Sequence, residues 1–228
     1  MSNIRYHPIA DNQEIKDYLE PNFWHQIKDY LYYFLRIFVT IAVIFVFFRT
    51  SVVDLIGIEG ESMFPNYNAR AGDSDKIYIN KLTPKFSSFK RGQVVVLISP
   101  PGCRAEKTLY IKRIIGLPNE TIRIADGAVY IINDQYQYPG IKLDESGYLK
   151  QSVKTYKKAT QPSNIEVVEK QLNSNQYYFM GDNRTGSQDS RVCGSILKDQ
   201  VLGEELFRST PIIKRGLFKL PKYNIGNQ

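Results

Sequence analysis

Histidine is almost absent from this chain of 228 residues. The two histidines, His7 and His25, both precede the longest apolar run. A Ser-His-Asp or Cys-His site is therefore excluded from the sequence that follows this run, and so is a histidine-based zinc site. The chain also lacks a glycine-rich phosphate-binding loop. Any catalysis in the C-terminal part must use Ser, Lys, Tyr, Asp, Glu or Cys side chains.

Cysteine is equally scarce. Cys103 and Cys193 are the only two, which is too few for a disulfide framework. They could pair in an oxidising compartment or remain buried thiols. We favour buried thiols, and the pairing stays open.

One apolar run extends from Tyr30 to Phe48 and is about long enough to span a bilayer. Arg36 lies near its start, where a long side chain can reach the interface. We predict a cytoplasmic N-terminal segment over residues 1–29 and a single transmembrane anchor over residues 30–50. The alternative is a buried core helix of a soluble protein.

The flanks of this run indicate how it is used. The run ends in the bulky residues Phe47 and Phe48, and Arg49 and Thr50 follow, where a cleaved targeting peptide would have small residues. We therefore predict an uncleaved anchor. Lys28 and Arg36 on one side, against Arg49 on the other, favour a cytoplasmic N-terminus and an extracytoplasmic C-terminal part. Residues 1–29 carry a net charge of −2, which leaves +9 on the rest of the chain. We interpret this charge as a surface facing lipid headgroups, and no motif supports nucleic-acid binding.

Residues 51–228 are predicted to form a mostly β domain. Short stretches rich in β-branched and aromatic residues alternate with Gly and Pro turns, and no helical periodicity of comparable length follows Phe48. The stretch 133–175 is polar and weakly patterned, so we expect a variable insertion or a solvated excursion. The expected strands are 51–58, 76–80, 93–99, 109–115, 121–124, 128–132, 176–180 and 201–208.

Ser62 lies in the segment Gly-Glu-Ser-Met-Phe-Pro, directly after the first expected strand. Glycine and proline around a serine favour a tight turn that can present the hydroxyl beside free backbone N–H groups. Most serines in such turns have no catalytic role, so this segment alone decides nothing.

Lys112 lies in the expected strand over residues 109–115. Alternation places it on one face with Tyr110 and Ile114, while Arg113 faces the other side. Apolar neighbours partly desolvate the amine, which lowers its pKa toward the range in which a lysine can act as a base. An ordinary edge lysine would show the same pattern.

A third segment, residues 181–191, is dense in polar side chains and follows an apolar strand. A solvated loop is the default interpretation of such a run. In an extended stretch, however, Ser187, Asp189 and Arg191 would share one side because they have the same parity.

In this order, these segments resemble the motifs of signal peptidase I, the membrane-bound serine-lysine peptidase that removes signal peptides from exported proteins. The resemblance covers about residues 30–215 and implies a single transmembrane helix followed by a β-rich catalytic domain. The matching segments are the anchor, Ser62–Pro65, Arg91–Val96, Tyr110–Pro118, Asp126–Ile131 and Gly181–Arg191.

The resemblance implies a serine endopeptidase that cleaves preproteins after a small-x-small motif through an acyl-enzyme, with no metal or organic cofactor. Ser62 would be the nucleophile, Lys112 the general base and later acid, and Ser187 the hydroxyl that orients the lysine amine. The family pattern further implies supporting pairs and pocket-lining residues. The supporting pairs are Asp182 with Arg113 and Asp189 with Arg191, and the pocket-lining residues are Ile58, Met63, Tyr110 and Ile111.

The chain departs from the family pattern beside the nucleophile. Gly60 stands where some members carry a serine whose hydroxyl helps to bind the oxyanion, so only backbone donors are expected there. Glu61 replaces a small residue, and we expect its carboxylate to point to water. Asn66 and Gln93 are further departures.

Two other functions remain open from the sequence. One is a dedicated serine-lysine processing peptidase, of the kind that serves conjugation or pilin maturation. The other is a non-catalytic, membrane-anchored β domain that binds a partner or anionic lipid. For the peptidase, the expected partners are exported preproteins, the lipid bilayer and the secretion machinery, with no nucleic acid.

Overall fold

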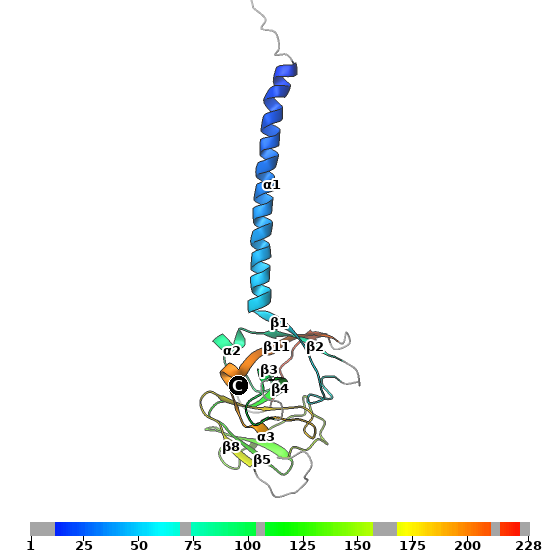
Figure 1. The fold of residues 1–228 in the computed structure, drawn as a ribbon. Coiled ribbons are helices and arrows are strands. Elements are labelled where there is room, and N and C mark those ends of the chain that lie inside the picture. The colour runs from blue at the N-terminus through cyan, green and yellow to red at the C-terminus, as the bar shows by residue number, and fades with distance from the viewer. Residues whose placement is uncertain (1–11, 69–73, 104–107, 157–167, 211–214, 224–228) are drawn as a thin grey trace, which may run out of the picture. The chain divides into compact units, whose positions relative to one another are not determined.

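The structure is a computed structural model that describes residues 12–68, 74–103, 108–156, 168–210 and 215–223, with side chains from residue 23 onward. The chain divides between Arg49 and Thr50 into two compact units. One consists of a long helix and the other is rich in β-strands, as Figure 1 shows. The expectation of a mostly β chain with one N-terminal apolar helix is confirmed.

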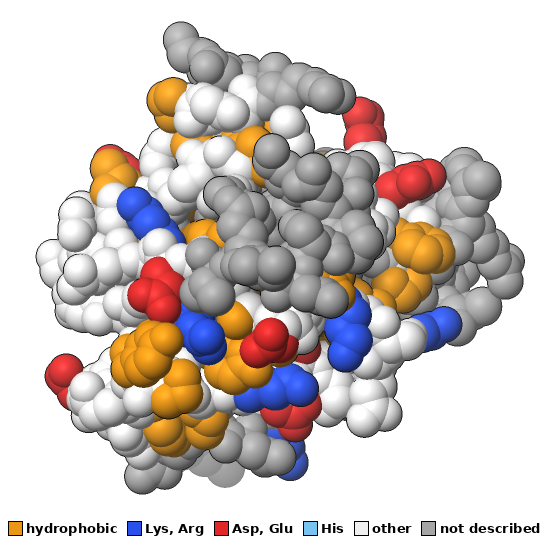
Figure 2. Space-filling view, turned by 90° about the horizontal axis from the view of Figure 1, so that it is seen from below, with side chains coloured by type: hydrophobic (Ala, Val, Ile, Leu, Met, Phe, Trp, Pro, Cys, Tyr) orange, Lys and Arg blue, Asp and Glu red, His pale blue; other side chains and the backbone are white. Residues whose placement is uncertain are grey.

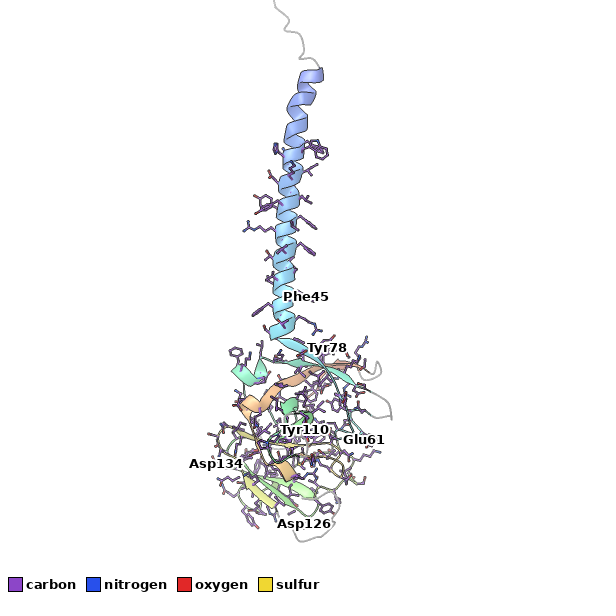
Figure 3. The ribbon with its side chains drawn as sticks, viewed as in Figure 1. Phe45, Glu61, Tyr78, Tyr110, Asp126 and Asp134 are labelled. Atoms are coloured by element: carbon purple, nitrogen blue, oxygen red, sulfur yellow. A yellow bond between two sulfur atoms is a disulfide. The ribbon has the colours of Figure 1, made fainter. Side chains whose placement is uncertain are left out.

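Helix α1 (Asn12–Ser51) is longer than the predicted anchor. Its 40 residues would extend about 60 Å at the usual rise per residue, roughly twice the thickness of a hydrocarbon core. The part that is apolar enough to cross a membrane runs from Phe23 to Ser51, and none of its most apolar window is buried. Figure 3 shows side chains projecting from both sides of the helix, with Phe45 among them. A core helix of a soluble protein would be buried, so this alternative does not fit.

The larger sheet carries strands in the order β1-β2-β11-β3-β4-β9-β10, and β12 pairs with β11. All its neighbouring strands are antiparallel. The strands are β1 (Val53–Gly57), β2 (Lys76–Asn80), β3 (Val94–Ile98), β4 (Leu109–Gly116), β9 (Gln176–Met180), β10 (Ile196–Leu197), β11 (Val201–Thr210) and β12 (Gly216–Leu217).

The smaller sheet has the order β7-β6-β5-β8 and is also antiparallel. Its strands are β5 (Thr121–Ala125), β6 (Ala128–Ile132), β7 (Ile141–Lys142) and β8 (Val168–Gln171). Three short helical turns complete the unit, namely α2 (Thr83–Phe86), α3 (Ser190–Cys193) and η1 (Lys198–Gln200). All eight predicted strands are present, within one or two residues at their ends. The elements that the sequence did not predict are four residues long or shorter.

Strand β4 lies in the interior of the larger sheet, between β3 and β9. Its register pairs Val95 with Lys112 on one side and Met180 with Arg113 on the other. From Ile111 to Gly116 every residue of the strand is buried. A lysine and an arginine are therefore held next to each other in the core, where a charge is costly unless it is paired.

The polar stretch 133–175 is more than a solvated excursion. Leu143, Leu149 and Leu172 are buried, and Leu143 and Leu172 belong to the apolar cluster between β5, β6 and β9. Leu143 and Leu172 thus each fill a place in the core, which a search for regular periodicity does not detect. Whether the stretch is an insertion remains a prediction.

The surface of the β unit does not segregate its charges on the face drawn in Figure 2. Basic and acidic side chains lie next to each other there, with hydrophobic side chains between them. On this face, basic side chains are therefore mixed with acidic ones.

Cys103 and Cys193 form a disulfide, so the preference for buried thiols was wrong. The bond joins the loop after β3 to the end of α3, across a sequence separation of 90 residues. The sequence does not reveal this pairing, because the loop and the turn are adjacent only through the order of strands in the larger sheet.

Removing this disulfide should destabilise the β unit. Because it closes a loop of 90 residues, Cys193→Ser should lower the free energy of unfolding by about 2–5 kcal/mol. Denaturant unfolding of the full chain in detergent micelles, with and without reductant, measures this loss. Reductant should destabilise the wild type to the level of the variant and leave the variant unchanged. Equal stability of oxidised wild type and variant would contradict the pairing.

Candidate active site

Ser62 lies in the turn that follows β1, and its side chain is half-buried. The turn begins at Gly60, whose φ of +78° is the left-handed conformation that favours glycine. It is closed by hydrogen bonds from the backbone N–H of Phe64 to the carbonyl of Glu61 and from that of Tyr67 to the carbonyl of Met63. The expectation of a tight turn that presents the serine is confirmed. Glu61 is exposed, as expected.

Lys112 reaches Ser62 from strand β4. Its Nζ atom lies 2.8 Å from Ser62 Oγ and 2.9 Å from the carbonyl oxygen of Ile111. The same atom lies 4.7 Å from the centroid of the Tyr110 ring. The lysine is only 3% exposed. The structure thus joins the two residues that the sequence singled out from segments 50 positions apart.

Burial lowers the pKa of Lys112 from its ordinary value of 10.5 to about 8. The negative charges of Asp189 and Asp182 act in the opposite direction and limit this shift. Burial disfavours the ammonium form, so about one amine in ten is neutral at pH 7 and most are neutral at pH 9. The amine can therefore accept a proton near neutral pH.

Arg113 and Asp182 form a buried ion pair behind the serine and lysine. The Arg113 Nε and Nη2 atoms donate to the two carboxylate oxygens of Asp182 at 2.8 and 2.6 Å, and Nη1 donates to the carbonyl of Gly92. The guanidinium also lies 4.1 Å from the centroid of the Tyr148 ring. This geometry agrees with the pairing that the resemblance implies.

Asp189 and Arg191 form the second implied pair. Arg191 Nε and Nη2 donate to the carboxylate at 2.8 Å each, and both side chains are buried. The carboxylate also accepts from the backbone N–H of Gly181. Burial alone would raise the pKa of Asp189, but Arg191 and these hydrogen bonds outweigh it and lower that pKa. Asp189 therefore stays ionised and links the end of β9 to α3.

Ser187 lies beside Gly181 and makes no hydrogen bond to Lys112. Its buried Oγ atom meets no described partner at hydrogen-bond geometry, but it lies close enough to Asp189 to help lower the pKa of that carboxyl group. A Cβ atom at Gly181 would lie 2.2 Å from Ser187 Oγ and 2.3 Å from the carbonyl oxygen of Ser62, so only glycine fits there. Gly181 thus allows the polar loop to approach the backbone of the serine turn.

A cleft of about 630 Å³ opens onto Ser62 and Lys112. Three of the four residues expected to bind substrate line it, namely Ile58, Tyr110 and Ile111. Met63 is not part of the cleft wall, because its side chain turns inward and packs in the same core cluster as Ile58 and Ile111. Figure 3 labels Tyr110 and Glu61, which both line the cleft.

Several residues of the site were not singled out from the sequence. Asn183 donates from its backbone N–H to the carbonyl of Ser62 at 3.0 Å and from Nδ2 to the carbonyl of Glu61 at 3.1 Å. Asn66 donates to Asp182 and to the carbonyl of Tyr148. The density of polar residues in 181–191 was a usable signal for Asn183. Asn66 was noted only as a departure from the family pattern, and Tyr148 gave no signal.

A metal site is not evident in the part of the chain that the structure describes. No group of three or more His, Cys, Asp or Glu side chains is placed there to hold an ion.

The sequence matches the family model "Signal peptidase, peptidase S26" over residues 31–210. Signal peptidase I of Bacillus amyloliquefaciens is 34% identical over 151 residues, which cover 66% of this chain and 72% of that protein. Signal peptidase IB of Staphylococcus aureus is 28% identical over 206 residues, covering 87% of this chain and 96% of that protein.

Among solved structures, a signal peptidase I from Enterococcus faecalis aligns with 52% of this chain and 97% of that chain. The sequence identity is 24% and the TM-score 0.36. The family model covers well over half of the chain, and the relative from Bacillus amyloliquefaciens exceeds 30% identity over more than two thirds of its own length. The chain therefore belongs to the signal peptidase family, peptidase S26.

Proposed function

We propose that this membrane-anchored serine peptidase cleaves signal peptides from preproteins with Ser62 as nucleophile and Lys112 as general base. Membership of the family indicates the reaction class. We assign the role of nucleophile to Ser62 Oγ and that of base to Lys112 Nζ. The observation that carries it is the 2.8 Å separation between Lys112 Nζ and Ser62 Oγ, with the amine buried.

The chemistry follows from the state of the amine. Neutral Lys112 takes the hydroxyl proton as Ser62 Oγ attacks the scissile carbonyl carbon. Backbone N–H groups of the turn stabilise the oxyanion, because Gly60 offers no hydroxyl. The C–N bond then breaks, and the Lys112 ammonium gives its proton to the departing amine of the mature chain.

The acyl-enzyme ester that remains is hydrolysed by the same two residues. Lys112 takes a proton from water as the water oxygen attacks the ester carbonyl, and the ammonium then returns this proton to Ser62 Oγ. Ser187 is proposed to orient the amine during these steps, since its buried hydroxyl lies next to the serine turn.

The ion pairs Asp182–Arg113 and Asp189–Arg191 are proposed as supports of this site. Both acids lie close enough to Lys112 to affect its pKa, so they also set how much of the amine is neutral. Ile58, Tyr110 and Ile111 in the cleft wall are proposed to bind the small side chains before the cleaved bond.

We place the N-terminus in the cytoplasm and the β unit on the extracytoplasmic side, anchored in the lipid bilayer. The disulfide supports this orientation, because such bonds persist in oxidising compartments. Exported preproteins emerge on that side, which would bring the secretion machinery close to the enzyme.

The dyad can be tested by removing either functional group. Ser62→Ala and Lys112→Ala should each lower the rate of preprotein cleavage by about 10⁴-fold or more, because the two groups act as one unit. Cleavage of a preprotein with Ala-x-Ala before the scissile bond measures this loss in detergent micelles. The exposed residues Ser88 and Lys85 provide the controls Ser88→Ala and Lys85→Ala, which should keep full activity.

Retained activity in a folded Ser62 or Lys112 variant would contradict the proposal. Cleavage of this preprotein alone, out of a panel of preproteins, would instead favour a dedicated processing peptidase. A membrane-anchored binding domain would bind its partner equally well with and without the dyad.

The pH dependence tests the proton acceptor separately. Because the pKa of Lys112 is lowered to about 8, kcat/KM should fall roughly tenfold per pH unit below that value and level off above it. Glu61→Gln is the matched control, since this exposed carboxylate lies beside the nucleophile and should not move the acid limb. A rate independent of pH between about 6 and 9 would exclude Lys112 as the titrating base.

A further inference from the structure

We infer that Glu145 is a positioning residue for the serine nucleophile, acting through Arg184. This inference rests on the proposed function and extends it to the polar stretch 133–175, which carries no recognisable motif. Glu145 touches neither Ser62 nor Lys112 by hydrogen bond.

The chain of contacts begins at the serine turn. Asn183 holds the carbonyl groups of both Glu61 and Ser62. The loop that carries Asn183 can approach this turn only because Gly181 has no side chain. The loop 181–184 therefore fixes the backbone of Ser62. The position of this backbone depends in turn on the contacts that hold the loop.

Arg184 fixes the loop from the inside of the protein. Its side chain is completely buried, and its Nε atom donates to the carbonyl of Gly181 at 3.0 Å. The carbonyl of Arg184 in turn accepts a hydrogen bond of 2.7 Å from Arg191 Nη1. The Arg184 guanidinium thus holds the start of the loop and the Arg191 guanidinium holds its end. The buried positive charge of Arg184 requires a counter-charge.

Glu145 supplies that charge. Arg184 Nη1 donates to Glu145 Oε2 at 2.8 Å, and Nη2 donates to Oε1. Thr155 from the same stretch accepts a second hydrogen bond from Nη1 at 2.5 Å. Among the described residues, the guanidinium's hydrogen bonds other than that to Gly181 therefore go to residues 145 and 155.

The same stretch contacts the other two arginines behind the site. Tyr148 stacks on Arg113 at 4.1 Å, and its hydroxyl donates to Glu145 at 2.5 Å. The carbonyl of Tyr156 accepts from Arg191 Nη1 at 3.0 Å. Residues 145–156 thus contact the arginines of three buried ion pairs, Arg113–Asp182, Arg184–Glu145 and Arg191–Asp189. Glu145 is the one carboxylate that these residues contribute to the three pairs.

The experiment compares Glu145→Gln with a matched variant, Glu120→Gln. Glu120 forms an equally buried, two-point pair with Arg91, but this pair is joined to Ile115, Leu117 and Asn133 rather than to the serine turn. Both substitutions remove one carboxylate from a buried arginine. Only the loss of Glu145 should loosen the nucleophile.

Steady-state cleavage of the Ala-x-Ala preprotein by the full chain, well below each melting temperature, gives kcat and KM separately. We expect Glu145→Gln to lower kcat about tenfold with KM unchanged within about twofold, because the cleft wall stays intact while the nucleophile is misplaced. Glu120→Gln should keep the wild-type kcat, although it also melts at a lower temperature.

Thr155→Val tests the same inference if Glu145→Gln does not fold. It keeps the ion pair, removes one hydrogen bond to Arg184, and should lower kcat roughly threefold without a change in KM. An unchanged kcat in folded Glu145→Gln, or in Thr155→Val if the former does not fold, would overturn the inference, as would an equal loss in Glu120→Gln. If the wild type itself failed to cleave the preprotein, the proposed function would fail instead.

Discussion

The site of this peptidase depends on the free energy of burying the amine of Lys112. A lysine in the core of a sheet favours its neutral form when its ammonium loses hydration without gaining a carboxylate in direct contact. Lys112 is in this position on β4, with Ser62 Oγ and the carbonyl of Ile111 as its hydrogen-bond partners. A base near neutral pH is thus obtained without histidine.

This arrangement requires that the surrounding charges be balanced. Two carboxylates lie near enough to raise the pKa of Lys112, and each is held by an arginine of its own, Asp182 by Arg113 and Asp189 by Arg191. Without these arginines, the acids would favour the ammonium and lower the fraction of neutral base. The buried ion pairs therefore act on the reaction through the protonation of the lysine as well as through geometry.

The sequence predicted the elements of the fold that have a regular local signal. The apolar run before Arg49 and the eight main strands were recognised by period and composition. The order of the family motifs predicted that Ser62 and Lys112 act together. Local patterns do not encode contacts between distant segments. Cys103 and Cys193 gave no sign of their bond, and the inward turn of Met63 depends on packing against Ile58 and Ile111.

The polar stretch 133–175 shows most clearly where sequence-based prediction ends. Its acids, amides and hydroxyls have the composition of a solvated loop, yet Glu145 and Thr155 are directed at a buried guanidinium. Only its partner distinguishes such a residue from an exposed one. The partner of Glu145 is Arg184, which lies 39 positions further along the chain.

The protonation of Lys112 is the central claim, and NMR can measure it directly. With ¹³C at the lysine Cε positions, the full chain in detergent micelles gives one titration curve for each resolved lysine, and the Lys112→Met variant identifies the signal of interest. The account predicts that Lys112 titrates near pH 8. A midpoint at the ordinary value of 10.5 would contradict it.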